Sequence, residues 1–131
     1  VFIHKKNKVF GAENGFVYLK KTGELLYYAN KSKDSVLPKS IKKITKKTYW
    51  CTSYINKFTL SKNVKYVNGN YLPVREGYLR KFYIPGKNKV KFVNCDAIDL
   101  QSKVTVYVNR HLKSYYKKVF RKCKNVKVRI G

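Results

Sequence analysis

Short apolar segments recur along this chain at a nearly constant spacing. Phe58 and Leu60 alternate with polar residues, and an equivalent pair, Phe82 and Ile84, follows 24 residues later. A third copy begins after another 24 residues, in the segment 106–108. Because side chains alternate along a strand, each pair points to one side of it. The spacing therefore predicts one short strand in each repeat, with the apolar side chains buried between stacked copies.

A second apolar pair follows each predicted strand. Ile41 and Ile44 in one copy correspond to Val64 and Val67 in the next, and the third copy is displaced by about two residues. A period of about 20–29 residues with a short strand and a returning segment is typical of leucine-rich repeats. We therefore predict a single domain over residues 1–131, of the α/β, β-rich class, folded as a right-handed leucine-rich-repeat solenoid. The repeats and a C-terminal cap would occupy residues 35–131.

The two ends of the chain have their own patterns. Residues 1–34 predict a leading strand at Val1 to Ile3 and then an inserted β-hairpin, with strands at 15–19 and 24–28 joined by a turn that contains Gly23. Near the other end, apolar residues at helical spacing from Leu112 to Phe120 predict a helix. The alternation at 126–130 predicts a last strand. Helix and strand together would form the cap.

The charge is unusually one-sided. The chain has 31 Lys and Arg residues against 6 Asp and Glu residues, which gives a formal net charge of +25, and only five of the basic residues are Arg. Such a field attracts polyanions, but lysine lacks the planar fork with which arginine contacts bases and phosphates in a bidentate manner. We therefore keep retention on a polyanion as an alternative function and expect no sequence-specific binding of nucleic acid.

The three cysteines and two histidines favour neither a metal site nor catalysis. Cys51, Cys95 and Cys123 form no CxxC pair and lack the ligand spacing of a zinc site, so we predict three buried, reduced thiols and no metal or other cofactor. His4 and His111 are expected at exposed, isolated positions. The chain also has no P-loop, GxGxxG or GxSxG motif, and we predict that it is not an enzyme.

No apolar run approaches the roughly 18 residues that cross a membrane, and no signal peptide is recognisable. The chain contains no Met and opens directly in strand-like sequence. We therefore expect it to be a piece of a longer or processed protein, and we expect the isolated domain to be monomeric.

Several motifs resemble those of the BspA-like leucine-rich repeats of bacterial surface and secreted proteins. They are the apolar-Pro step at Leu37-Pro38, the Ile41–Ile44 pair, and the aromatic segment that leads to Cys51. The segment 10–28 is similar to the hairpin that often lies between such repeats. The sequence departs from the pattern in 68–77, which lacks the usual cysteine. The resemblance implies a cell-surface or secreted location and a role in adhesion or protein binding.

The strand alternation also indicates a binding surface. If Phe58 and Phe82 face the core, the residues beside them must face outward, and stacking would align these across neighbouring strands. The predicted binding residues are Lys57, Thr59, Lys81, Tyr83, Tyr107, Lys127 and Arg129. Thr105 is expected in the same rows. Tyr and Arg are enriched at binding hot spots, and the sheet face of a solenoid is its usual concave contact surface.

We therefore predict a non-catalytic module that recognises a macromolecule, either a protein or an anionic glycan of a host or bacterial surface. The polyanion alternative would include cell-wall polymer, glycosaminoglycan and nucleic acid. The same residues are also compatible with purely structural roles. Tyr83 and Tyr107 could stack only to stabilise adjacent strands, and the lysines could serve only to keep a large surface hydrated.

Overall fold

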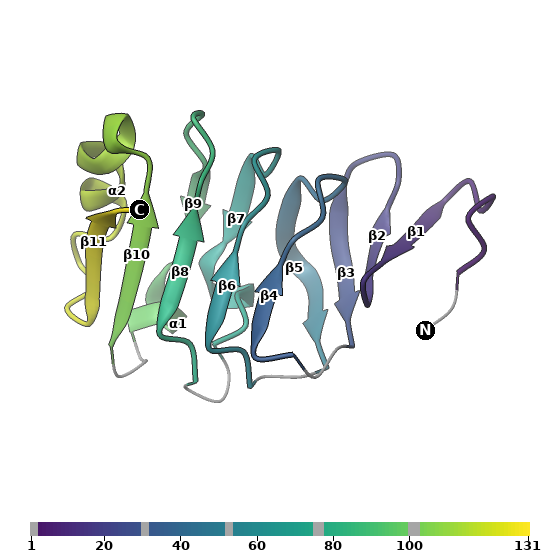
Figure 1. Cartoon of the computed structure of the whole chain (residues 1–131), viewed down its shortest axis with the longest axis horizontal. Coiled ribbons are helices and arrows are strands. Elements are labelled where there is room, and N and C mark those ends of the chain that lie inside the picture. The colour runs from purple at the N-terminus through teal and green to yellow at the C-terminus, as the bar shows by residue number, and fades with distance from the viewer. Residues whose placement is uncertain (1–2, 30–31, 52–53, 75–77, 100–102) are drawn as a thin grey trace.

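The computed structural model describes residues 3–29, 32–51, 54–74, 78–99 and 103–131, which form two β-sheets and short helices (Figure 1). The first sheet is mixed and has the strand order β1-β2-β3-β5-β7-β9. Its strands are β1 (Phe10–Glu13), β2 (Phe16–Leu19), β3 (Glu24–Tyr28), β5 (Lys43–Trp50), β7 (Tyr66–Asn68) and β9 (Lys91–Val93).

The second sheet is entirely parallel and has the order β11-β10-β8-β6-β4. Its strands are β4 (Asp34–Val36), β6 (Lys57–Thr59), β8 (Lys81–Ile84), β10 (Val104–Val108) and β11 (Val126–Ile130). From β4 to β10 the chain alternates between the two sheets, and Figure 1 shows the parallel sheet in front of the mixed one.

The core lies between the sheets and is rich in aromatic rings. Phe58 and Phe82 from the parallel sheet are completely buried and stack on each other at a centroid distance of 5.7 Å. Trp50 of β5 meets Phe58 edge-on at 5.3 Å, and Phe92 of β9 meets Phe82 at 6.2 Å. Edge-on and offset ring pairs of this kind add to the free energy gained from burial. The two sheets therefore share one continuous core.

Short helices complete the molecule. They are α1 (Asp96–Asp99), α2 (Lys113–Val119) and the single-turn 3-10 helices η1 (Gly69–Tyr71) and η2 (Arg110–Leu112). Helix α2 is held against the strands by two tyrosines. The Tyr116 hydroxyl accepts a hydrogen bond from the backbone N–H of Val90 at 3.0 Å, and the Tyr115 hydroxyl donates to the Val90 carbonyl at 2.8 Å.

The predicted leucine-rich-repeat solenoid is wrong. The structure is instead a mixed α/β domain with two sheets, one mixed and one parallel. The prediction failed because it treated the segments after each repeat strand as returning segments, whereas these pair with one another as β5, β7 and β9. The hairpin is also not an insert, since β3 continues the same sheet by pairing in parallel with β5.

Several local predictions are confirmed. Strands β2 and β3 form the predicted antiparallel hairpin, and Gly23 in its turn has a positive φ of 72°. The helix near the C-terminus and the last strand also form where the sequence pattern predicts them. The predicted leading strand is not confirmed: Ile3 is outside any strand, and residues 1 and 2 lie outside the described residues.

Strand β1 was missed by the sequence reasoning. It pairs antiparallel with β2 across Asn14 and Gly15, which have φ values of 52° and 84°. An Asn-Gly pair with two positive φ values is the strongest short-range signal for a two-residue hairpin loop. The first three strands therefore form a continuous antiparallel meander at one end of the mixed sheet.

Candidate functional site

The outer face of the parallel sheet carries two straight rows of side chains. Strand registers align the first row, which we call the tyrosine row: Val36, Thr59, Tyr83, Tyr107 and Arg129. The same registers align a second row two residues earlier on each strand. We call it the lysine row: Asp34, Lys57, Lys81, Thr105 and Lys127. Between the rows the side chains point inward, as buried Phe58 and Phe82 do. The rows are thus a direct consequence of strand alternation.

All seven binding residues predicted from the sequence lie in these two rows. Lys81, Lys127 and Arg129 are exposed, and the other four are half-buried. The rows extend further than predicted, because β4 adds Asp34 and Val36 at one end. These two were missed because the inward residue of β4 is Ser35, a polar residue that breaks the apolar alternation.

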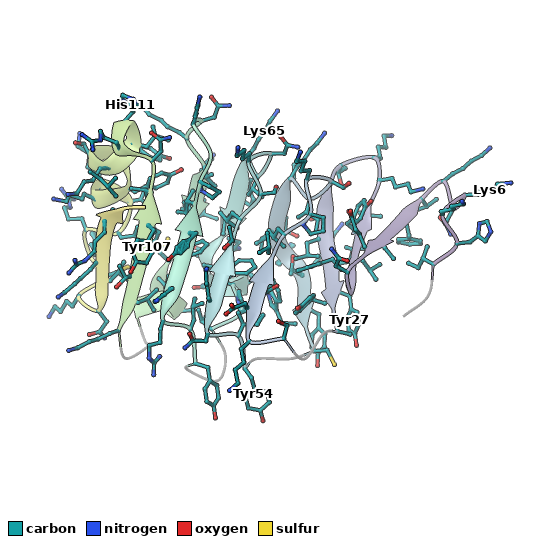
Figure 2. All side chains as sticks on the ribbon, viewed as in Figure 1. Lys6, Tyr27, Tyr54, Lys65, Tyr107 and His111 are labelled. Carbon is teal, nitrogen blue, oxygen red and sulfur yellow. The ribbon has the colours of Figure 1, made fainter. Side chains whose placement is uncertain are left out.

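Tyr83 and Tyr107 form the aromatic centre of this face. Their rings stack with centroids 4.5 Å apart and planes inclined by 22°. The Lys57 ammonium lies over the Tyr83 ring, 4.9 Å from its centroid, which is within the range of a cation–π contact. Figure 2 shows Tyr107 on the front of the molecule, over the parallel sheet. Aromatic rings held in this way present a large surface with little further entropy to lose on binding.

Two shallow hollows lie beside Tyr107, which lines both. The first has a volume of about 390 Å³ and also involves Lys57, Thr59, Tyr83, Asn109 and the C-terminal Gly131. The second has a volume of about 370 Å³ and is bordered by Thr105, Lys124, Lys127 and Arg129. The face therefore offers two depressions that have the Tyr107 ring as a common wall.

The electrostatic character of the face is strongly positive. Within the two rows the only carboxylate is Asp34, which lies at the edge strand opposite Lys57. Lys57 and Lys81 lie directly opposite each other on β6 and β8. Two lysines in directly opposed cross-strand positions concentrate positive charge on this part of the face, and such a charge attracts anions.

The prediction of three buried thiols is wrong in part. Cys123 is buried, but Cys95 is half-buried and Cys51 is exposed. Cys51 follows inward-facing Trp50, so strand alternation places it outside. It shares a hydrogen bond with Tyr27, and this bond raises the pKa of the Tyr27 hydroxyl. In the described parts of the chain, no three His, Cys, Asp or Glu side chains gather as they would around a metal ion.

The two histidines lie far apart. His4 is exposed near the N-terminus, where its Nδ1 accepts a hydrogen bond from the backbone N–H of Lys6 at 3.1 Å. His111 is exposed in η2, close to α2 and at the opposite end of the sheets (Figure 2). Neither lies on the face that carries the two rows.

No protein-family model, no curated protein and no solved structure matches this chain. The similarity to BspA-like repeats therefore stays a prediction from the sequence. None of the helices within the described segments has the length and the hydropathy to cross a bilayer.

Proposed function

We propose that this domain is a non-catalytic binding module that recognises a macromolecule through the outer face of the parallel sheet. The observation that carries the proposal is the stacked pair Tyr83 and Tyr107, presented between cationic side chains on a rigid sheet. Tyrosine and arginine are enriched at the energetic centres of interfaces, and here both residue types belong to one row.

The shape of the face favours an extended ligand over a small molecule. Five strands spaced about 4.8 Å apart give the rows a length of about 20 Å. Both hollows are shallow and share Tyr107, so a ligand that fills them would also cover this ring. A protein segment or a glycan chain meets this requirement.

A second function, electrostatic retention on a polyanion, is favoured by a different observation. The lysine row contains three lysines and belongs to a chain with a net charge of +25. Binding dominated by such charges weakens steeply as salt increases, whereas contacts made by buried aromatic surface do not. Salt dependence therefore separates the two functions.

The location of the protein and the origin of its partner belong to the proposal as well. A cell-surface or secreted location is supported by the motif resemblance alone. The partner would then be a protein or an anionic glycan of a host or bacterial surface.

The test is a binding screen against extracellular proteins and glycans, run at low and at high salt. The first variant carries Tyr83→Ser and Tyr107→Ser, and the second carries Lys57→Gln, Lys81→Gln and Lys127→Gln. A matched control is Tyr54→Ser with Tyr78→Ser, another tyrosine pair, which is exposed, has centroids 5.1 Å apart and lies outside both rows.

Recognition through the tyrosine row predicts that the first variant loses binding at both salt concentrations. The lysine variant should then mainly lose the salt-dependent part of the affinity, and the control should bind like the parent. If the lysine variant alone loses binding, the polyanion function is correct. Parent-like binding by both variants would place the interface elsewhere.

A further inference from the structure

The outer face of the mixed sheet, on the other side of the molecule, carries a third hollow with a volume of about 380 Å³. Three lysines line it: Lys43, Lys46 and Lys47. The remaining lining residues are Thr22, Glu24, Thr45, Tyr66 and Asn68. Cross-strand pairing aligns Glu24, Lys43 and Tyr66 as one outward row, while Leu25, Ile44 and Val67 beside them are buried. Apart from Thr22, which lies in the turn before β3, all of the lining residues are in strands β3, β5 and β7.

An irregularity in β5 creates this hollow. Leu25 pairs with Ile44, but Tyr27 pairs with Tyr49, so β5 uses more residues than β3 to cover the same length. The extra residues leave the sheet as a bulge that contains Lys46 and Lys47. Bulges redirect side chains and are frequent beside functional sites. Here the bulge brings two further lysines to the hollow that Lys43 already lines.

The bulge is held by threonine hydroxyls. The Thr48 hydroxyl is buried, donates to the Leu25 carbonyl at 2.6 Å and accepts from the Thr45 N–H at 3.1 Å. The Thr45 hydroxyl accepts from the Lys47 N–H at 3.1 Å and donates to the Glu24 carboxylate. Backbone groups that lose their cross-strand partners at the bulge are thus hydrogen-bonded to threonine hydroxyls. Through the Thr45 hydroxyl, the Lys47 backbone and the Glu24 carboxylate are also connected to each other.

We propose that this hollow binds an anionic sugar unit, a hydroxylated ring that carries a phosphate, sulfate or carboxylate group. The lysines supply the point charges that attract the anionic group. Glu24 would repel a bare inorganic anion, but its carboxylate is a strong acceptor for sugar hydroxyls. A ligand that has both an anionic group and hydroxyl donors matches this combination, and neither a simple anion nor a neutral sugar does.

The size of the hollow and the position of Tyr66 agree with such a ligand. Small-molecule sites range over roughly 300–1,000 Å³, so this hollow falls at the small end. Tyr66 is half-buried at its wall and has an apolar ring face on which the carbon side of a sugar ring can pack. The site is on a different sheet from the tyrosine row, so this inference does not depend on the proposed macromolecular binding.

Glucose 6-phosphate is a suitable probe, with glucose and inorganic phosphate as comparisons. Amide chemical shifts of the ¹⁵N-labelled protein are followed during titration at physiological salt. We expect saturable shifts at Lys46, Lys47 and Asn68 with glucose 6-phosphate, and weaker ones with either comparison compound. Lys46→Gln combined with Lys47→Gln should weaken the binding about fivefold to tenfold. Lys39→Gln with Lys87→Gln removes the same charge at two exposed positions outside the hollow and should leave the binding unchanged.

Glu24→Gln provides the decisive measurement, because a sugar site and a plain positive patch predict different changes in the preference for glucose 6-phosphate over inorganic phosphate. If Glu24 accepts sugar hydroxyls, this variant gains less affinity for glucose 6-phosphate than for inorganic phosphate, so the preference falls. If the hollow is only a positive patch, removing the carboxylate strengthens the binding of both compounds by the same factor, and the proposal is wrong. Equal affinities for glucose 6-phosphate and inorganic phosphate in the parent would also overturn it.

Discussion

Tyr83 and Tyr107 occupy directly opposed positions on β8 and β10, and their rings stack 4.5 Å apart. A stacked cross-strand pair stabilises the sheet that presents it, even without a ligand. The structure thus makes the two rings candidates for a structural role and a binding role at the same time. The two roles separate experimentally, since only the structural one affects the unfolding of the isolated domain.

A double-mutant cycle measures the structural role of this pair. Tyr83→Ser, Tyr107→Ser and the double variant are compared with the parent by urea denaturation. We expect a coupling free energy of about 0.5–1.5 kcal/mol, which is the range found for aromatic pairs beyond simple burial. A coupling indistinguishable from zero would show that the contact does not stabilise the sheet, and the rings would then be maintained for binding alone.

Helix α2 provides a sharper test of stability. Tyr116→Phe leaves the Val90 N–H without its acceptor in a fully buried position, so we expect a loss of about 1–3 kcal/mol in the free energy of unfolding. Tyr115→Phe is the matched control, because its hydroxyl bonds to the same residue from a half-buried position. Its loss should be smaller. The reverse order would mean that the Val90 N–H is satisfied in another way.

The same tyrosine predicts how stability depends on pH. Burial raises the pKa of Tyr116 above the ordinary value of 10.0, so the folded state holds its proton more tightly than the unfolded chain. The stabilisation is complete below pH 10 and is lost as the pH rises from there through the folded pKa. We expect the urea midpoint to fall more steeply above pH 10 in the parent than in Tyr116→Phe. Lysine titration acts on both proteins and cancels in the comparison; parallel curves would contradict the assignment.

Cysteine reactivity tests the corrected burial pattern. Cys51 is exposed and Cys123 is buried, so a thiol reagent should label Cys51 at once in native buffer and Cys123 only when the protein unfolds. Mass spectrometry of the digested protein identifies the labelled site. Cys51→Ser is the control and should abolish the fast phase. A fast phase that persists in this variant would place a different thiol at the surface.

The tyrosine and lysine rows were predictable because they depend only on the register between neighbouring strands. Phe58 and Phe82 have the same place in consecutive apolar patterns, and their pairing fixes the register of every residue beside them. Exposure of Cys51 could have been predicted in the same way, from the inward position of Trp50. Likewise, Asn14 and Gly15 carry the hairpin signal that would have revealed β1.

The two-sheet architecture and the hollow on the mixed sheet could not be predicted from the sequence in this way. Strands β7 and β9 have three residues each, too few for an alternation that distinguishes a strand from a connecting segment. The bulge in β5 depends on a bond from the Thr48 hydroxyl to Leu25, which is 23 residues away in the chain. Such a tertiary contact leaves no local pattern, so a run of lysines and threonines gives no sign of the site that it forms.

Gly23 connects the β2–β3 hairpin to strand β5 of the mixed sheet. Its carbonyl accepts hydrogen bonds from the N–H groups of Lys42 and Lys43, so it links the hairpin to β5 beside the hollow on the mixed sheet. A side chain at this position is doubly unfavourable. The φ of 72° is costly for any residue with a Cβ, and that Cβ would lie 2.8 Å from the Lys42 Cβ and 3.0 Å from the Lys42 backbone nitrogen.

Gly23→Ala should therefore lower the free energy of unfolding by at least about 2 kcal/mol, measured by urea denaturation. Gly86→Ala is the matched control, because the added Cβ would meet its nearest neighbour, the Lys62 carbonyl oxygen, only at 3.4 Å. We expect that variant to change stability by less than about 1 kcal/mol. Gly23→Ala should also weaken glucose 6-phosphate binding, because Thr22 and Glu24 on either side of the turn residue line the hollow. Parent-like stability of Gly23→Ala would show that the turn adopts a different backbone conformation.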